Sequence, residues 1–278
     1  MSSAPPFATR LREAIDRSGS LLCVGLDPSG CAGAAEAERL FAEVLDAALE
    51  HVCAVKPNAA FFAQHGSAGW GVLERLRARV PPDRMLIVDA KVGDIGSTAE
   101  AYARTVFDRL GADAVTVNPL MGEDAVRPFL ERPGRGVFVL ARTSNPGAAD
   151  LLERRLDDGT PVYAHLARLA TGWDPGGAVG LVVGATAPEA VAALRRLAPE
   201  APLLLPGVGA QGGSVEAAVA AGLDAAGAGL VVSVSRGIAN APEGPAAAAR
   251  QWRERIEAAR YHVTRAGTAP PAYEPPPV

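Results

Sequence analysis

Short runs of apolar residues alternate with longer amphipathic segments along most of this chain. The apolar runs are rich in Val, Leu, Ile and Ala, which is typical of strands buried on both faces of a parallel sheet. Polar or turn-forming residues end each run. We expect eight strands, at 21–27, 52–58, 85–88, 114–120, 136–144, 180–186, 202–209 and 229–235.

The segments between the runs have the spacing and composition of amphipathic helices. We expect helices at 7–17, 34–49, 68–79, 97–110, 123–131, 151–171, 188–197, 214–222 and 245–260, the sixth interrupted by a turn at 157–161. Ser97 and Glu100 have the spacing of a capping box. Eight strand–helix repeats after an N-terminal helix predict an α/β fold of the (β/α)8 (TIM) barrel class, and an open doubly wound sheet is the alternative.

Polar side chains gather at the carboxyl ends of the predicted strands. In a barrel this end carries the active site. The residues concerned are Asp27, Lys56, Asp89, Lys91, Asn118, Ser144, Gln211 and Arg236.

The stretch 85–96, MLIVDAKVGDIG, is the most informative of these strand ends. Because side chains alternate along a strand, Asp89 and Lys91 should point to the same side, and Asp94 follows where the chain leaves the sheet. Lys56 and Lys91 are the only lysines among 27 Lys and Arg residues. Lysine can give up a proton and guanidinium hardly does, so both lysines are candidates for chemistry. A structural ion network at the barrel mouth is the alternative, and the two aspartates could instead hold Mg²⁺.

The segment PGVGAQGG contains G-x-G-x-x-G as Gly207, Gly209 and Gly212. A dinucleotide site would need an acidic residue at the end of the next strand, but that strand ends in SVSRG. Glycines that expose backbone N–H groups, followed by Arg236, predict a phosphate-monoester pocket. The alternative is that the glycines only allow tight turns and that Arg236 is simply exposed to solvent. Asp27 could bind a sugar hydroxyl or serve a turn. Ser144 shortly precedes Pro146-Gly147, which favours a turn, and a functional role for it rests on its position after the fifth strand.

Composition narrows the function further. The chain has 278 residues, 49% hydrophobic and 21% charged, and a net charge of −4, so it has no general attraction for nucleic acid or anionic membrane. Three cysteines without a C-x-x-C pair and four histidines without H-E-x-x-H spacing predict no cysteine or histidine metal site. We expect a cytoplasmic protein, because we see no signal peptide or membrane span. Residues 1–265 should form one catalytic domain, and residues 266–278 a disordered proline-rich tail.

Several segments together resemble one enzyme family. LCVGLDPS, VKPNAAFF, DAKVGDIGST, TSNPGA, PGVGAQGG and SRG, in this order and spacing, are similar to the orotidine 5′-phosphate decarboxylases, particularly their longer bacterial branch. The similarity extends from about residue 21 to residue 238. It implies cofactor-free decarboxylation of orotidine 5′-phosphate to UMP in pyrimidine biosynthesis, in a homodimer of barrels.

The resemblance also implies roles for individual residues. Lys91 would protonate C6 as carbon dioxide leaves, and Asp89 would lie beside the departing carboxylate and orient Lys91. Asp94, Ile95 and Thr98 would reach into the partner subunit's site. The remaining substrate-binding positions would be Asp27 and Lys56 at the ribose, Ser144, Pro206 and Val208 at the base, and Gln211 and Arg236 at the phosphate, together with Asn58 and Ser235.

Three other functions share some of these features. A Mg²⁺-dependent sugar-phosphate aldolase or decarboxylase of the same superfamily would use Asp89 and Asp94 near the metal. A non-catalytic phosphate-binding barrel would keep only the pocket. A Schiff-base lyase would use one of the two lysines as a nucleophile.

Overall fold

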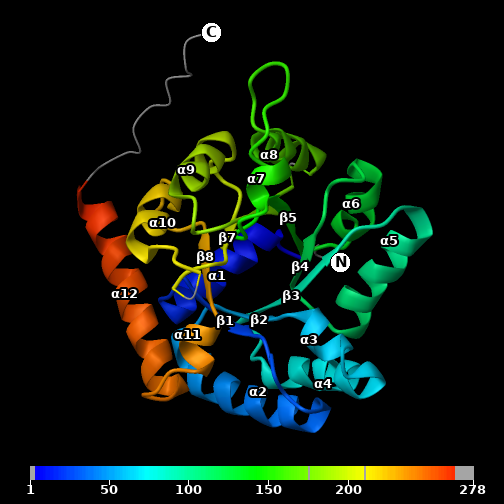
Figure 1. Cartoon of the computed structure of the whole chain (residues 1–278), viewed down its shortest axis with the longest axis vertical. Helices are drawn as coiled ribbons and strands as arrows, with labels where there is room; N and C mark the ends of the chain where they lie inside the picture. The colour runs from blue at the N-terminus through cyan, green and yellow to red at the C-terminus, as the bar shows by residue number, and fades with distance from the viewer. Residues whose placement is uncertain (1–3, 175, 210, 267–278) are drawn as a thin grey trace.

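The computed structural model describes residues 4–174, 176–209 and 211–266. In this part of the chain eight parallel strands form a closed barrel in sequence order, because β1 pairs with both β2 and β8 (Figure 1). The predicted (β/α)8 class is therefore confirmed. The strands are β1 (Leu22–Leu26), β2 (Ala54–Pro57), β3 (Met85–Val92), β4 (Ala114–Val117), β5 (Gly136–Arg142), β6 (Val179–Val183), β7 (Leu203–Leu205) and β8 (Leu230–Val234).

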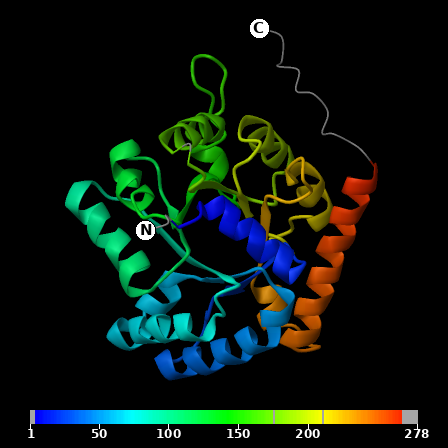
Figure 2. The same cartoon turned by 180° about the vertical axis from the view of Figure 1, so that it is seen from behind.

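Helices surround the barrel on its outside (Figures 1 and 2). None of those in the described ranges is long and apolar enough to cross a membrane. The helices are α1 (Phe7–Ser18), α2 (Ala34–Ala48), α3 (Ala59–Ala63), α4 (Gly66–Arg79), α5 (Gly96–Ala103), α6 (Glu123–Leu130), α7 (Ala148–Leu151), α8 (Val162–Trp173), α9 (Pro188–Leu197), α10 (Val215–Gly222), α11 (Arg236–Ala239) and α12 (Pro245–Ala266), with a 3-10 turn η1 (Leu49–His51) and a π-helical turn η2 (Arg104–Arg109).

Helix α1 closes the amino-terminal end of the barrel, which it crosses in Figure 2. Its buried face includes Phe7, Leu11 and Ile15. The Phe7 ring meets Phe138 edge to face at 5.6 Å between centroids. A Cβ on Gly136 would come within 2.4 Å of the Phe7 ring, so only glycine lets α1 approach β5 this closely. The opposite end of the barrel, formed by the carboxyl ends of the strands, is not covered by this helix.

The start of α5 differs from the predicted capping box. The helix begins at Gly96 with Ile95 as its N-cap, and no side chain caps it. Glu100 instead accepts hydrogen bonds from Arg104 and Arg132 at 2.7 and 2.6 Å, and these take its carboxylate away from the helix start. The capping-box prediction is wrong because arginine partners compete for the same carboxylate.

Other helix boundaries also depart from the sequence-based expectation. In the segment predicted as one interrupted helix at 151–171, residues 152–161 are not helical, so the helix proper is α8, which starts at Val162, and α7 ends at Leu151. The short helices α3 and α11 were not predicted, because four or five residues carry no helical periodicity. Helix α12 continues six residues beyond its expected end, to Ala266. The rest of the predicted tail, 267–278, lies outside the described residues.

A buried carboxylate connects several elements at the amino-terminal end of the barrel. Asp113, before β4, is 4% exposed and accepts hydrogen bonds from Arg10 at 2.6 Å and Arg77 at 3.1 Å. It also accepts the backbone N–H of Leu86 at 2.9 Å, and Arg135 lies at 3.4 Å. A buried carboxylate is tolerated when its oxygens are paired in this way.

We therefore expect Asp113→Ala to lower the free energy of unfolding by about 2–4 kcal/mol, because it leaves the buried Leu86 N–H without an acceptor and three arginines without a carboxylate. Urea unfolding of the variant and the wild type measures this. Asp46→Ala is the control, since Asp46 and Arg79 form an exposed pair and should contribute less than about 1 kcal/mol. Equal losses in the two variants would contradict a special role for Asp113.

Candidate active site

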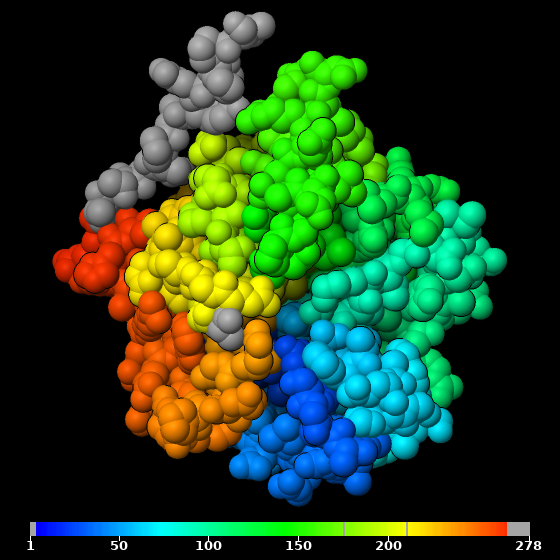
Figure 3. All heavy atoms as spheres, viewed as in Figure 1, coloured from blue at the N-terminus to red at the C-terminus, as the bar shows by residue number. Residues whose placement is uncertain are grey.

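A cavity of about 350 Å³ opens at the carboxyl ends of the strands. Figure 3 shows this face, where the segments after β5 (green), β7 (yellow) and β8 (orange) surround a recessed centre. Most of the predicted site residues line the cavity: Asp27, Lys56, Asn58, Asp89, Lys91, Ser144, Pro206, Val208, Gln211, Ser235 and Arg236. The barrel thus brings together residues that are far apart in the sequence.

The charged centre of the cavity is Asp89, held between the two lysines. Its Oδ2 accepts a hydrogen bond from Lys56 Nζ at 2.8 Å, and its Oδ1 accepts one from Lys91 Nζ at 2.6 Å. Lys56 is almost fully buried, whereas 48% of the Lys91 side chain is exposed. One lysine is therefore fixed inside the barrel wall, and the other presents its ammonium group to the cavity.

Asp89 and Lys56 hold each other in their charged forms. Burial raises the pKa of Asp89, but Lys56 and Lys91 lower it by more, and the pKa lies well below its usual range. Burial likewise lowers the pKa of Lys56, but Asp89 and Asp27 outweigh it and raise that pKa above its ordinary value. At neutral pH Asp89 is therefore a carboxylate and Lys56 an ammonium group.

The backbone that carries Asp89 and Lys91 is not a regular strand. Val88 pairs with Val115 and Val92 pairs with Val117, so three residues of β3 lie opposite one residue of β4. Lys91 has φ 50° and is the only non-glycine residue of the described chain with positive φ. The prediction that Asp89 and Lys91 meet is confirmed, but the cause differs: a bulge, not simple alternation, turns Lys91 toward Asp89. Left-handed backbone of this kind costs about 1–2 kcal/mol.

Asp27 follows β1 and carries an unused acceptor. Its Oδ1 is buried and has no hydrogen-bond partner among the described residues. A buried carboxylate oxygen without a donor is unfavourable unless a ligand supplies one. The atom lies in the wall of the same cavity as Lys56 and Asp89.

The loops after β5 and β7 meet on the other side of the cavity. Gly207 has φ +93°, and a Cβ there would come within 2.8 Å of Ser144 Cβ and 3.1 Å of Gln211 Oε1. Glycine is therefore required both for the backbone conformation and for the close approach. This contact places Ser144 beside the residues of the glycine-rich segment.

Three N–H groups of the glycine-rich segment are used within the loop. Those of Gly209, Gly212 and Gly213 donate to loop carbonyls at 3.2, 2.8 and 3.1 Å. These three groups serve the turn and are not free for an anion. Gln211 and Arg236 are exposed and line the cavity, and the Arg236 guanidinium has no hydrogen-bond or ion-pair partner in the described chain. These two side chains could bind an anion at this end of the cavity.

Asp94, Ile95 and Thr98 do not line this cavity. They lie around the start of α5, where Ile95 and Thr98 are exposed and Asp94 Oδ1 accepts the backbone N–H of Ile95 at 2.8 Å. The structure therefore separates these three predicted residues from the others.

Among the residues in and around the site that were not recognised from the sequence, two make informative hydrogen bonds. Thr116 lies in the cavity wall and hydrogen-bonds with both Asp89 and Lys91. Trp252 of α12 donates its indole N–H to Gly237 O at 3.1 Å and packs against Gly209, so it supports the loops after β7 and β8. The available signals were one polar residue within the apolar run AVTV and one tryptophan in a charged helix.

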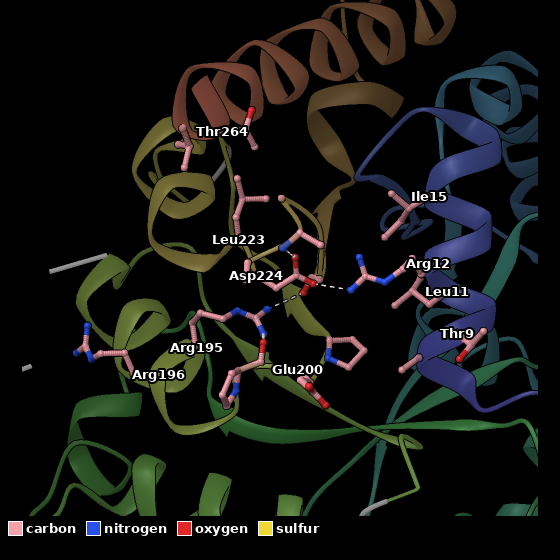
Figure 4. A pocket seen from close by; sticks show the side chains of 18 of the residues that line it. Thr9, Leu11, Arg12, Ile15, Arg195, Arg196, Glu200, Leu223, Asp224 and Thr264 are labelled. Atoms are coloured by element: carbon pink, nitrogen blue, oxygen red, sulfur yellow. Dashed lines mark hydrogen bonds and ion pairs between the residues drawn. The ribbon is translucent and has the colours of Figure 1, made fainter. Parts of the chain in front are cut away.

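A larger cavity of about 1080 Å³ lies at the opposite end of the barrel, between α1, the β7 and β8 entry loops and α12 (Figure 4). Its buried cation, Arg195, donates to backbone carbonyls, including Gly222 O and Gly229 O, both at 2.8 Å. Asp224 pairs with Arg12 at 2.6 Å and accepts backbone N–H groups of its own loop. These groups are engaged in holding the fold, so the smaller cavity is the better candidate for chemistry.

In the described ranges no group of three or more His, Cys, Asp or Glu side chains is placed to hold a metal ion. Both oxygens of Asp89 already accept hydrogen bonds from ammonium groups. A divalent cation at this carboxylate would have to approach two positive charges. The donor set is therefore suited to an uncharged or anionic ligand.

Fold and site define a (β/α)8-barrel protein whose pocket combines two lysines, buried carboxylates and an exposed arginine. Comparison with known proteins identifies its family. The family model described as "Orotidine 5'-phosphate decarboxylase / HUMPS family" matches residues 20–252. The chain belongs to this family.

Individual relatives are similar over nearly their whole length. The chain is 50% identical to the orotidine 5′-phosphate decarboxylase of Roseiflexus castenholzii, over 91% of this chain and 98% of that protein. It is 46% identical to the enzyme of the same name from Thermomicrobium roseum, over 92% and 97%. The solved structure of Leishmania donovani OMP decarboxylase superposes with a TM-score of 0.86 at 43% identity, covering 92% of this chain and 99% of that one.

The charge pattern around Asp89 predicts a specific pH dependence of stability. Since its folded-state pKa lies below the unfolded value of about 3.9, the carboxylate stabilises the fold fully above about pH 5, and this contribution is lost as the pH falls through and below 4. Asp89→Asn leaves Lys56 buried without its counterion and should cost about 3 kcal/mol at pH 7. Urea unfolding at pH 7, 5 and 3 should show an unchanged difference from wild type at pH 5 and a smaller one at pH 3. A difference that shrinks between pH 7 and 5 would contradict the depressed pKa.

Proposed function

We propose that this chain is a carboxy-lyase that converts orotidine 5′-phosphate to UMP and carbon dioxide, in pyrimidine biosynthesis, without a cofactor. The observation that carries the proposal is the Asp89 carboxylate between Lys56 and Lys91, in a cavity whose other side holds Gln211 and Arg236. The family and the relatives named above support the substrate. Orotidine 5′-phosphate carries a phosphate at one end and a carboxylate at the other. The phosphate would suit the side of the pocket with Gln211 and Arg236, and the carboxylate would suit the side with Lys91.

The reaction requires a proton at the carbon that loses carbon dioxide. When the bond between C6 and the carboxylate carbon breaks, its electron pair stays on C6. The Lys91 ammonium, half exposed to the cavity, donates a proton to that pair, and its N–H bond electrons remain on Nζ. Lysine suits this step because it can give up a proton at neutral pH more readily than arginine can.

Asp89 serves this step in two ways. It pairs with Lys91 and fixes its Nζ at 2.6 Å. It also places a negative charge beside the substrate carboxylate, so the repulsion between the two is relieved when uncharged carbon dioxide leaves. The same carboxylate therefore orients the acid and favours departure of the product.

The ribose and the base would occupy the middle of the cavity. A ribose hydroxyl can donate to the unpartnered Oδ1 of Asp27, and Lys56 lies close enough to this region to join the same network. We assign Ser144 to hydrogen bonding with the pyrimidine, Pro206 and Val208 to the wall beside the base, and Asn58 to the substrate-binding wall next to Lys56.

The phosphate would bind where the loops after β7 and β8 meet. Arg236 offers an exposed guanidinium and Gln211 a side-chain amide, with Ser235 at the same rim of the cavity. Charge-assisted hydrogen bonds from guanidinium to phosphate are among the stronger polar contacts in proteins. Binding energy released here, far from C6, can be used to hold the carboxylate against Asp89.

We further propose that the protein acts as a homodimer with shared sites. Asp94, Ile95 and Thr98 lie outside their own chain's cavity. Large apolar side chains are exposed in the adjoining segments after β3 and β4: Ile95 (56%), Tyr102 (41%), Leu120 (58%) and Met121 (53%). Large exposed apolar residues on neighbouring segments favour a protein–protein interface there. A partner seated there would receive Asp94, Ile95 and Thr98 in its own site.

We propose that residues 1–265 act as one catalytic domain, because the strands close a single barrel and the cavity draws on loops from around it. A cytoplasmic location is part of the same proposal, since the pathway's substrates are small soluble metabolites. The Mg²⁺-dependent alternative is disfavoured by the ammonium groups that occupy both oxygens of Asp89.

Turnover tests the activity directly. Purified protein should consume orotidine 5′-phosphate, followed by the change in ultraviolet absorbance, at the same rate with and without EDTA. Lys91→Ala should fall below about one-thousandth of the wild-type rate, because the proton donor is removed. Arg79→Ala, a change of similar size at an exposed ion pair outside the cavity, should keep the wild-type rate.

Three results would argue against the assignment. Loss of turnover with EDTA would favour the metal-dependent alternative. Absence of turnover in the wild type would favour the non-catalytic barrel. Trapping of the substrate on either lysine by borohydride would favour a Schiff-base lyase.

Hybrid dimers test the shared site. Asp94→Ala and Lys91→Ala should each be inactive alone, but a mixed dimer contains one site with an intact Lys91 and an intact Asp94. Random exchange at equal concentrations should therefore restore about a quarter of the wild-type activity. No recovery despite subunit exchange verified by mass spectrometry would show that each site belongs to one chain.

A further inference from the structure

We propose that Thr116 is a positioning residue that aims the Lys91 ammonium at Asp89. Its hydroxyl takes the place of the backbone partner that β3 loses at its bulge. The inference rests on the proposed role of Lys91 as proton donor and adds the residue that holds that donor in place.

The pairing of β3 with β4 leaves a gap beside Lys91. Regular pairs lie on either side, at Val88 with Val115 and at Val92 with Val117. Thr116 is the β4 residue between them, and the Lys91 N–H donates to Thr116 Oγ1 at 2.9 Å. A side-chain oxygen therefore accepts the hydrogen bond at the point where the backbone ladder is interrupted.

The hydroxyl also contacts the carboxylate that Lys91 faces. Thr116 Oγ1 lies 2.9 Å from Asp89 Oδ1, the same atom that accepts from Lys91 Nζ. An ionised carboxylate can only accept, and a backbone N–H can only donate. The hydroxyl must therefore donate to Asp89 and accept from Lys91, so its orientation is determined at both ends.

One hydroxyl thus links both ends of the Lys91 residue. It holds the backbone N–H in the left-handed conformation at φ 50°, and through Asp89 Oδ1 it fixes the target of the ammonium group. Lys91 needs such a support, because its side chain is half exposed and has many rotamers to lose. Without the hydroxyl the Lys91 N–H would lack its acceptor. The left-handed conformation of Lys91 would then lose the hydrogen bond that stabilises it.

Thr116 is well suited to this task by its surroundings. It is 1% exposed, and its branched side chain has few rotamers in a strand. Valine has nearly the same shape but no hydroxyl, and serine has the hydroxyl without the methyl group. The two substitutions therefore separate hydrogen bonding from packing.

The test compares Thr116→Val, Thr116→Ser and wild type in turnover of orotidine 5′-phosphate. We expect Thr116→Val to lower kcat by about 10- to 100-fold with KM changed less than about 3-fold, because the proton donor is misplaced while phosphate and ribose contacts remain. Thr116→Ser should keep kcat within about 3-fold of wild type. Thr171→Val, which removes a helix hydroxyl bonded only within α8, should behave as wild type.

Melting temperature and a crystal structure of Thr116→Val complete the test. We expect a melting temperature lowered by only a few degrees, because one N–H loses its acceptor while the packing is kept, and a Lys91 Nζ displaced from the 2.6 Å contact with Asp89 Oδ1. The structural result does not depend on the activity, so it is informative even if the wild type does not turn over the substrate. An unmoved Lys91, a wild-type kcat in Thr116→Val, or equal losses in the Val and Ser variants would overturn the proposal.

Discussion

The carboxylate of Asp89 is the interaction on which the site depends. Lys56 can be buried in the barrel wall because this carboxylate pairs with it at 2.8 Å and the charge of Asp27 adds to the compensation. Lys91 presents its ammonium to the cavity because the same carboxylate holds it at 2.6 Å. The opposite charges compensate one another's burial. The result is an ammonium group, Lys91, held in a fixed position beside the negative charge of Asp89. Such preorganised charge can act on a substrate without any rearrangement of the protein during the reaction.

The barrel divides stability and chemistry between its two ends. At the amino-terminal end α1 covers the core, and the charges of Asp113 and Arg195 are met by partners within the protein. At the carboxyl-terminal end, acceptors and donors such as Asp27 Oδ1 and Arg236 lack protein partners in the described chain. Polar groups that are satisfied hold a fold together, and polar groups that are not satisfied await a ligand.

Much of this arrangement was predictable from the sequence. Alternating apolar runs and amphipathic segments predict the barrel, and a barrel brings the strand ends bearing Asp27, Lys56, Asp89 and Arg236 to one face. The bulge in β3 was not predictable, because the residues 85–92 have no glycine or proline to mark it. The roles of Thr116 and of the glycine N–H groups depend on hydrogen bonds between distant segments, which local patterns do not encode. The position of Asp94 outside its own cavity likewise follows from the path of the chain into α5.

A crystal structure of the protein with UMP bound would show whether Lys91 faces the reacting carbon. We expect the phosphate at Arg236 and Gln211, a ribose hydroxyl on Asp27, and C6 of the base facing Lys91 Nζ within about 3.5 Å, the reach of a proton transfer. We also expect a second chain that contributes Asp94 to the same site. A base whose C6 points away from Lys91, or a phosphate bound elsewhere, would show that Lys91 is not the proton donor in this pocket.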